Sequence, residues 1–212
     1  MASHPIDLRT RTPILLVESI RCENRVLSNI EKHNRRLNSA RRELLGLGDA
    51  WNLARLVIVP KDLGKGLFKC RVVYADKIVK IEFVPYERKT VNRLRIVTDD
   101  SIDYAFKYAD RSRLDRLRAL AGPDEDVVIV KNGLVTDSSS ANLVFDTGSG
   151  LLTPATPLLK GTRRALLLAR KRIRTADIRP ADIRSYKSVH LVNAMLDLGD
   201  LELKISDSTF YE

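Results

Sequence analysis

The sequence predicts an α+β fold in two domains, and three observations lead to this prediction. Strand-like segments of apolar residues recur through most of the chain. One long helical pattern starts at Asn29, and a short helix opens later with a capping box at Ser112 and Asp115. A β-branched run then follows at Val127–Val130, typical of a strand buried on both faces. We therefore expect residues 1–108 to form a small α+β domain, and the remainder, 109–212, to form a β-rich α/β domain.

The first domain is expected to be a mostly antiparallel sheet beside one long helix. From Asn29, apolar residues recur at helical spacing with arginines between them, and Gly46 ends the pattern. Residues 14–22 form a strand pattern before this helix, and residues 53–59 are compatible with a strand or a helix. Residues 1–13 are expected to be an irregular arm. Further strands are expected at Leu67–Tyr74, Ile78–Pro85, Leu94–Val97 and Tyr104–Tyr108.

The second domain is organised around the stretch from Asp126 to Phe145. Asn132-Gly133 is the strongest short signal for a hairpin. The returning strand is interrupted by D-S-S-S-A-N at residues 137–142 before apolar residues resume. Polar groups in a buried strand pair cost about 1–3 kcal/mol each if they are unpaired. The interruption is therefore either a surface turn or a polar wall that faces a ligand.

Composition and charge exclude several classes of protein. Apolar residues make up 44% of the 212-residue chain, and no apolar run approaches the roughly 18 residues that span a bilayer. The N-terminus lacks the apolar core of a secretory signal, so a cytoplasmic location is expected. Two cysteines and three histidines show no metal-ligand spacing, so no metal is expected. The net charge of +10 allows nucleic-acid binding, but the basic residues are scattered, and the same charge attracts anionic metabolites.

Three motifs, in this order along the chain, resemble the class IV aminotransferases. The first is Lys107 in F-K-Y-A-D-R, and the second is Asp137 followed five residues later by Asn142. The third is G-T-R-R at residues 161–164, where a helix opens. This family has the fold-type IV architecture that binds pyridoxal phosphate (PLP), and it includes branched-chain and D-amino-acid aminotransferases and 4-amino-4-deoxychorismate lyase. The resemblance extends over residues 16–196.

The resemblance implies that Lys107 forms the Schiff base with PLP. Lys107 precedes Val127 by 20 residues, close to the family's spacing between its lysine and the next strand. Alignment to the lyase motif K-x-x-N-x-L would instead put Ser112 at this position, but a serine cannot form an imine. Asp137 would then be the partner of the pyridine nitrogen, a position where the family usually has glutamate.

The resemblance also implies a phosphate site. Thr162 and Arg163 open a helix, whose free N–H groups and dipole favour an anion. H-N-R-R-L at residues 33–37 resembles the family's H-x-x-R-L and indicates Arg36 as a second phosphate ligand, with Arg35 as the competing candidate. The other implied cofactor contacts are Asn142 in the polar wall, Leu159 against the ring, and Asn193 and Ala194 in the turn that closes the phosphate site.

The substrate contacts are expected on strands of the first domain. Glu18, Arg71 and Tyr74 are the candidates, and Arg71 could hold a carboxylate bidentately. Alternation puts Arg71 and Tyr74 on opposite strand faces, so only one of them is expected to face the substrate. The implied reaction is amino transfer between an amino acid and a 2-oxo acid in a homodimer. The alternatives are a pyruvate-releasing 4-amino-4-deoxychorismate lyase and, from another class, a basic nucleic-acid-binding or non-catalytic protein.

Overall fold

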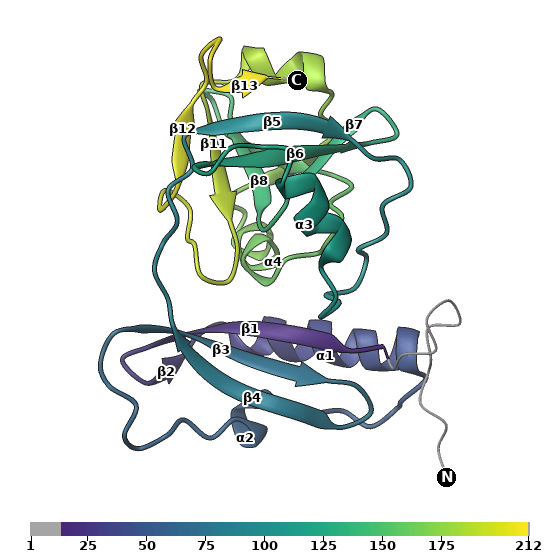
Figure 1. Ribbon diagram of the computed structural model, residues 1–212, viewed down its shortest axis with the longest axis vertical. Coiled ribbons are helices and arrows are strands. Elements are labelled where there is room, and N and C mark those ends of the chain that lie inside the picture. The colour runs from purple at the N-terminus through teal and green to yellow at the C-terminus, as the bar shows by residue number, and fades with distance from the viewer. Residues whose placement is uncertain (1–13, 212) are drawn as a thin grey trace. The chain divides into compact units, whose positions relative to one another are not determined.

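The computed structural model describes residues 14–211 and divides the chain into two compact units (Figure 1). The first unit contains the described residues up to Glu87 together with Phe106–Asp110. The second unit contains Arg88–Ala105 and the chain from Arg111 onward. The chain therefore passes between the units more than once, whereas the sequence suggested a single boundary after residue 108. The expected N-terminal arm lies outside the described residues.

The first unit is a four-stranded antiparallel sheet with one long helix, as expected. The strand order is β2-β1-β3-β4, and β1 pairs with β3 along its whole length. The segment at residues 53–59 that the sequence left undecided contains a short helix. The elements are β1 (Leu16–Glu23), β2 (Val26–Leu27), α1 (Ile30–Leu45), α2 (Leu53–Leu56), β3 (Leu67–Tyr74) and β4 (Ile78–Pro85).

The core of the first unit lies between α1 and the sheet. Leu37 and Ala40 on the apolar stripe of α1 belong to the same buried cluster as Ile20 of β1 and Val72 of β3. Figure 1 shows α1 lying along this sheet. Residues three apart lie on the same face of a helix, so this stripe determines which side chains of α1 turn toward the sheet. The helix ends at Gly46, whose positive φ of 68° allows the left-handed cap.

The second unit is built around a nine-stranded sheet with α3 and α4. The order is β10-β9-β8-β7-β6-β5-β13, and β11 pairs with both β8 and β12. Its elements before the second helix are β5 (Arg93–Thr98), α3 (Ser112–Arg118), β6 (Glu125–Lys131), β7 (Leu134–Ser138), β8 (Asn142–Asp146) and β9 (Leu151–Pro154). Then follow α4 (Thr162–Ala169), β10 (Arg174–Ala176), the 3-10 helix η1 (Pro180–Ser185), β11 (Ser188–Val192), β12 (Glu202–Lys204) and β13 (Phe210–Tyr211).

The hairpin expected at Asn132-Gly133 is confirmed. β6 and β7 are antiparallel, and both turn residues have positive φ, 52° and 73°, as a type I′ turn requires. Val128 and Val130 of β6 are buried in the main core of this unit. The capping box expected at Ser112 is wrong in position, because Ser112 is already the first residue of α3 and Arg111 occupies the cap.

Two strand assignments from the sequence are corrected by the structure. β5 was expected in the sheet of the first domain, but it runs parallel to β6 in the second unit, from Arg93–Glu125 to Thr98–Val130. Leu94 of β5 is fully buried in the core of that unit, so its burial comes from this sheet. The strand expected at Tyr104–Tyr108 is reduced to one isolated bridge between Leu16 and Tyr108.

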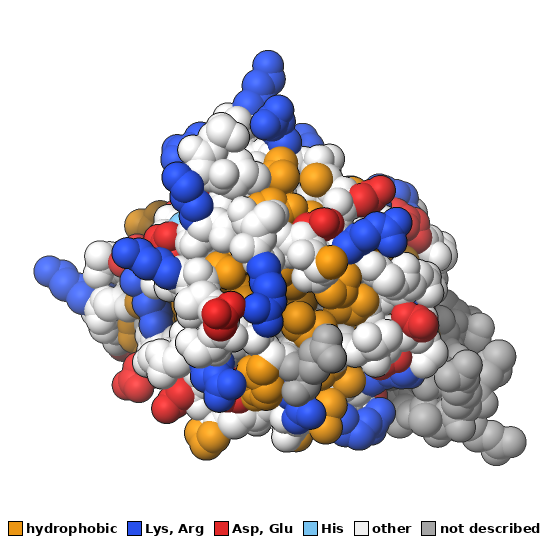
Figure 2. Space-filling view, turned by 90° about the horizontal axis from the view of Figure 1, so that it is seen from above, with side chains coloured by type: hydrophobic (Ala, Val, Ile, Leu, Met, Phe, Trp, Pro, Cys, Tyr) orange, Lys and Arg blue, Asp and Glu red, His pale blue; other side chains and the backbone are white. Residues whose placement is uncertain are grey.

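Basic, acidic and apolar side chains are mixed on the face shown in Figure 2. Several basic side chains form ion pairs, such as Arg184 with Asp207 at 2.9 Å. Within residues 14–211, no helix is long and apolar enough to cross a membrane, and no cluster of three or more His, Cys, Asp or Glu could hold a metal.

Candidate active site

A buried carboxylate, Glu18 on β1, is the centre of the first group of site residues. Its Oε1 accepts a hydrogen bond from Arg36 Nε at 2.8 Å, and its Oε2 accepts from Arg36 Nη2 at 2.6 Å. His33 Nδ1 lies 2.6 Å from the same Oε2. His33 and Arg36 are three residues apart on α1, so both side chains lie on one face of the helix. Burial raises the pKa of Glu18, but Arg36 and His33 outweigh it and lower this pKa to about 2.

His33 is held in its neutral form by its surroundings. Burial lowers the pKa of His33, the hydrogen bond to Glu18 opposes this, and the positive charges of Arg36 and Lys107 lower the pKa further. A pKa below the ordinary value leaves the imidazole uncharged at pH 7. Because Glu18 is ionised, Nδ1 carries the proton and donates it to Oε2.

Lys107 belongs to the same unit, and its charge acts on His33. The backbone around Lys107 is attached to the strand that carries Glu18. The N–H of Val17 donates to the Lys107 carbonyl at 2.9 Å, and the next residue, Tyr108, forms the bridge with Leu16. Lys107 itself is half-buried. The isolated bridge therefore brings the predicted lysine to the Glu18 cluster, although 89 residues separate Lys107 from Glu18.

The structure distinguishes the two candidate arginines of α1. Arg36 faces the buried Glu18, and only 15% of its side chain is exposed. Arg35 is exposed on another face of the helix. The position that the H-x-x-R-L motif indicates is therefore the one turned toward Glu18 and His33, and Arg35 offers a matched control on the same helix.

The three expected substrate residues differ in burial. Tyr74 is 1% exposed and packs in the core of the first unit, with its ring 6.2 Å from that of Trp51. Glu18 is 0% exposed, and both of its oxygens are occupied. Arg71 pairs with Glu82 on β4 at 3.0 Å. Arg71 and Tyr74 lie on opposite faces of β3, as alternation predicts, and the face that carries Tyr74 is the core. Tyr74 and Glu18 therefore expose almost no surface, and their contact with substrate stays a prediction.

The second group of site residues is centred on Asp137 of β7. Asp137 and Asn142 are paired in register between β7 and β8. Asn142 Nδ2 donates to Asp137 Oδ1 at 2.7 Å and to the Leu159 carbonyl at 2.8 Å, and the Leu159 N–H donates to Asp137 Oδ2 at 2.9 Å. In the interrupting stretch, residues 137–142, only Ser140 is exposed. The stretch is therefore a mostly buried polar turn whose tip, Ser140, is exposed.

Asp137 is a buried carboxylate without a cationic partner. Burial raises the pKa of Asp137 to about 6, and the hydrogen bonds from Leu159 and Asn142 and the more distant charge of Arg164 oppose this rise. Within residues 14–211 no lysine, arginine or histidine forms an ion pair with Asp137. A positively charged group placed beside it would be strongly stabilised there.

The raised pKa of Asp137 predicts a pH-dependent stability of the cofactor-free protein. The pKa is about 6 in the folded state against an ordinary value of 3.8, so ionisation favours the unfolded state. The protonated carboxyl therefore stabilises the folded state, fully below pH 3.8. This contribution to the free energy of unfolding is lost as the pH rises through about 6, and it amounts to about 3 kcal/mol at ~1.4 kcal/mol per pKa unit. Denaturant unfolding should show Asp137→Asn gaining about that much on the wild type between about pH 4 and pH 7.5. Parallel pH curves for the two proteins would show that Asp137 is not desolvated.

The serine turn, residues 138–141, is attached to two other segments of the second unit. Arg111 Nη2 donates to the Ser139 carbonyl at 3.0 Å, and Asn193 Nδ2 donates to the Ser140 carbonyl at 3.2 Å. Ser138 Oγ accepts from the N–H of Ser140 at 3.2 Å within the turn. Asn193 was predicted from the sequence, whereas no sequence signal indicated Arg111, because its partner is a backbone carbonyl.

The start of α4 provides a site for an anion close to Asn142. Gly161 is the N-cap, and no side chain caps the helix. A Cβ on Gly161 would overlap Asn142 Oδ1, so the backbone enters the helix directly against this side chain. The first turn contains no acidic residue, and Thr162 is 3% exposed. The N–H groups at the start of the helix and the positive end of the helix dipole favour a negatively charged ligand.

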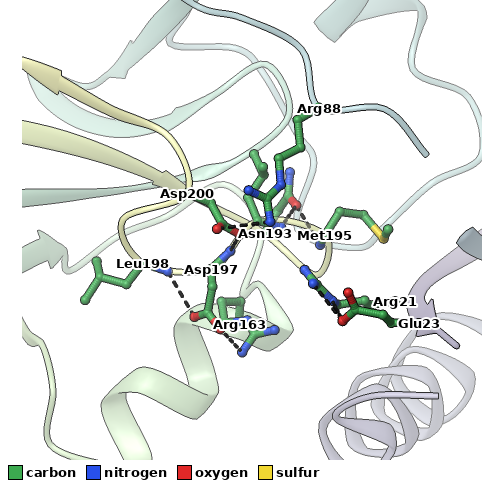
Figure 3. A network of polar contacts seen from close by, with 10 residues as sticks. Arg21, Glu23, Arg88, Arg163, Asn193, Met195, Asp197, Leu198 and Asp200 are labelled. Carbon is green, nitrogen blue, oxygen red and sulfur yellow. Dashed lines mark hydrogen bonds and ion pairs between the residues drawn. The ribbon is translucent and has the colours of Figure 1, made fainter. Parts of the chain in front are cut away.

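Two consecutive arginines fix the start of α4 to neighbouring segments. Arg164, which the sequence reasoning missed, donates from Nη2 to the Pro154 carbonyl at 2.8 Å and from Nε to Thr153 Oγ1 at 3.2 Å. The side chain of Arg163 pairs with Asp197 at 3.0 Å (Figure 3). The predicted contact of Arg163 with phosphate is therefore left to its backbone N–H.

Comparison with known proteins agrees with this fold. The family model for "Amino-transferase class IV" matches residues 104–200. An uncharacterized protein of Haemophilus influenzae is 36% identical over 182 residues, covering 85% of this chain and 97% of that protein. A crystal structure from Haemophilus somnus 129PT, provisionally assigned as a 4-amino-4-deoxychorismate lyase, is 31% identical with a TM-score of 0.79, covering 87% of this chain and 98% of that one.

A PLP-bound structure is also similar in fold. The PLP-bound form of a hypothetical aminotransferase from Mycobacterium tuberculosis has a TM-score of 0.69 and 18% identity, covering 92% of this chain and 82% of that one. The chain belongs to the class IV aminotransferase family. The family contains PLP-dependent aminotransferases and lyases that share one fold, fold-type IV.

Proposed function

We propose that this chain binds PLP and transfers an amino group between an amino acid and a 2-oxo acid, with Lys107 as the catalytic amine. The observation that carries the proposal is that the second unit contains a position that favours a cation next to a position that favours an anion. Asp137 is a buried carboxylate that forms no ion pair with any residue between 14 and 211, and the start of α4 favours an anion. Asn142 contacts both of these features. A cofactor with a pyridinium at one end and a phosphate at the other matches this arrangement.

The residues present fit PLP on the chemistry of their donors and acceptors. Asp137 would accept a hydrogen bond from the ring nitrogen, and its charge would keep that nitrogen protonated. The N–H groups of Thr162 and Arg163 would donate to the phosphate, and the Arg36 guanidinium would add charge-assisted hydrogen bonds. Leu159, whose backbone is clamped by Asp137 and Asn142, would pack against the ring.

Lys107 performs the proton transfers in this proposal. When bound, PLP supplies a ring that withdraws electrons and makes the α-proton of an amino acid removable. Lys107 Nζ would hold the cofactor covalently, and would then take the α-proton as a base and return it as an acid. His33 is neutral and donates to Glu18, so Arg36 and Glu18 form a buried ion pair beside the lysine.

Amino transfer and pyruvate release are separated by one assay. A panel of amino acids should be tested as amino donors, each with a 2-oxo acid as acceptor. An aminotransferase should convert at least one of these donors into its own 2-oxo acid. The second candidate is supported by the structure from Haemophilus somnus, which carries a provisional lyase assignment. Pyruvate from 4-amino-4-deoxychorismate, with no turnover of any amino donor, would replace the proposed reaction by the lyase reaction.

Arg36 is expected to bind the phosphate, and Arg35 is its matched control. Arg36→Ala should weaken PLP binding by about 1–3 kcal/mol, the range for charge-assisted hydrogen bonds, whereas Arg35→Ala should leave it nearly unchanged. Because Arg36→Ala leaves the buried Glu18 without its main partner, both substitutions should also be made in a Glu18→Gln background. PLP titration of the cofactor-free proteins measures the effect. A larger loss of PLP affinity from Arg35→Ala than from Arg36→Ala would show that Arg35, and not Arg36, binds the phosphate.

A further inference from the structure

Two ion pairs hold the loop at residues 193–200 that follows β11. Asp197 Oδ2 lies 3.0 Å from Arg163 Nη1 at the start of α4, and Asp200 Oδ1 lies 3.1 Å from Arg88 Nη2 (Figure 3). The two aspartates are also linked to each other, because the N–H of Asp197 donates to Asp200 Oδ2 at 2.7 Å. The loop therefore has a defined conformation with its acidic side chains turned to two arginines.

Arg163 is an unusual residue to find at this place in the helix. It is the second residue of α4 and is only 9% exposed, and its Nε makes no hydrogen bond within residues 14–211. A buried guanidinium is costly unless it has an anionic partner, and Asp197 supplies that partner. The ion pair thus joins the start of α4 to the 193–200 loop.

The other end of the loop reaches the serine turn through Asn193. Asn193 Oδ1 accepts from the N–H groups of Met195 and Leu196, at 2.8 and 3.0 Å. Its Nδ2 donates to the Ser140 carbonyl. The start of α4, the Asn193–Ala194 turn and the serine turn are therefore connected in one network. The first two of these segments contain residues proposed to contact the cofactor.

We propose that Arg163 and Asp197 are a positioning pair that fixes the Asn193–Ala194 turn for binding of the cofactor phosphate. The inference rests on the proposed function, because it concerns the PLP site. Arg163 would serve twice, with its backbone N–H toward the phosphate and its side chain toward the loop. The competing role is direct attraction, in which the guanidinium draws the phosphate and Asp197 weakens that attraction. The two roles predict opposite effects of removing Asp197.

Equilibrium binding of PLP to the cofactor-free protein tests the positioning role. Asp197→Asn should raise the Kd for PLP about threefold to tenfold, the scale of a half-exposed ion pair. Arg163→Gln keeps the backbone N–H and should have a similar effect, and the double variant should be no weaker than either single one. Asp197→Glu should restore binding to within about twofold of the wild type, because it restores the ion pair. Asp207→Asn, which breaks the exposed pair with Arg184, is the matched control and should have no effect.

Pyridoxal, which lacks the phosphate, provides the second measurement. The Kd for pyridoxal should be equal in the wild type and in Asp197→Asn. If the substitution unfolded the loop in general, the affinities for PLP and for pyridoxal would fall equally, and this result would contradict positioning of the phosphate. Tighter PLP binding by Asp197→Asn, or a Kd equal to that of the Asp207→Asn control, would also overturn the positioning pair. Failure of the wild type to bind PLP at all would instead overturn the proposed function, and the inference with it.

Discussion

Replacing Lys107 by alanine should reduce turnover by at least about 10³-fold, because acid–base catalysis alone contributes roughly 10²–10⁴-fold and the covalent link is lost as well. Lys107→Arg should be equally inactive, since a guanidinium keeps the charge but stays protonated and is no nucleophile. Formation of the 2-oxo acid at saturating PLP is the measurement. The phosphate contacts remain in both variants, so the loss should appear in kcat.

Lys69 on β3 is the matched control for this experiment. It is a half-buried lysine of the same unit, and Lys69→Ala should keep turnover close to that of the wild type. If Lys107→Ala kept more than about a tenth of the wild-type turnover, the roughly 10²–10⁴-fold effect of a general acid–base group would be absent and another amine would have to be sought.

Replacing Asp137 by asparagine should lower turnover by at least about 100-fold, the scale of losing one strong electrostatic group at a reacting centre. The carboxylate would stabilise positive charge on the ring nitrogen, and a neutral amide cannot. Asparagine also has a single acceptor oxygen, so it loses the hydrogen bond from either Asn142 or Leu159. PLP should still bind, because the phosphate contacts and Lys107 are unchanged. Measurement of kcat and of the Kd for PLP separates these two effects.

Asp126→Asn and Asp137→Glu complete the Asp137 experiment. Asp126 is another buried aspartate of the second unit, 3% exposed, and its replacement should not lower kcat comparably. Asp137→Glu keeps the charge and should retain far more activity than Asp137→Asn. Wild-type turnover by Asp137→Asn would leave Asp137 with a structural role only, as the acceptor that holds Asn142 and Leu159.

Much of the site could be predicted because its local patterns have one structural meaning. The helical period of α1 puts His33 and Arg36 on the same face, and the structure finds both on Glu18. The Asn132-Gly133 turn specified the hairpin of β6 and β7. The spacing of five residues from Asp137 to Asn142 brings these two side chains into register between β7 and β8. These features depend on neighbours in sequence, which a pattern records directly.

The remaining features depend on partners that are distant in the sequence. The apolar run of β5 indicated a strand but not its neighbour, and its parallel partner β6 begins 32 residues after Arg93, at Glu125. Alternation on β3 separated Arg71 from Tyr74 but could not show that the inner face is core. Asp197 and Arg163 are 34 residues apart, and only the packing of the 193–200 loop brings them together.

Reduction with borohydride, followed by peptide mapping, tests most directly whether Lys107 is the residue that holds the cofactor. Protein saturated with PLP would be reduced, digested and analysed by mass spectrometry. The expected result is one stoichiometric cofactor adduct, on the peptide that contains Lys107, and its absence from Lys107→Ala. An adduct on a different lysine would contradict the assignment of Lys107 as the catalytic residue. The absence of any adduct at saturating PLP would contradict the proposal that this protein is a PLP-dependent enzyme.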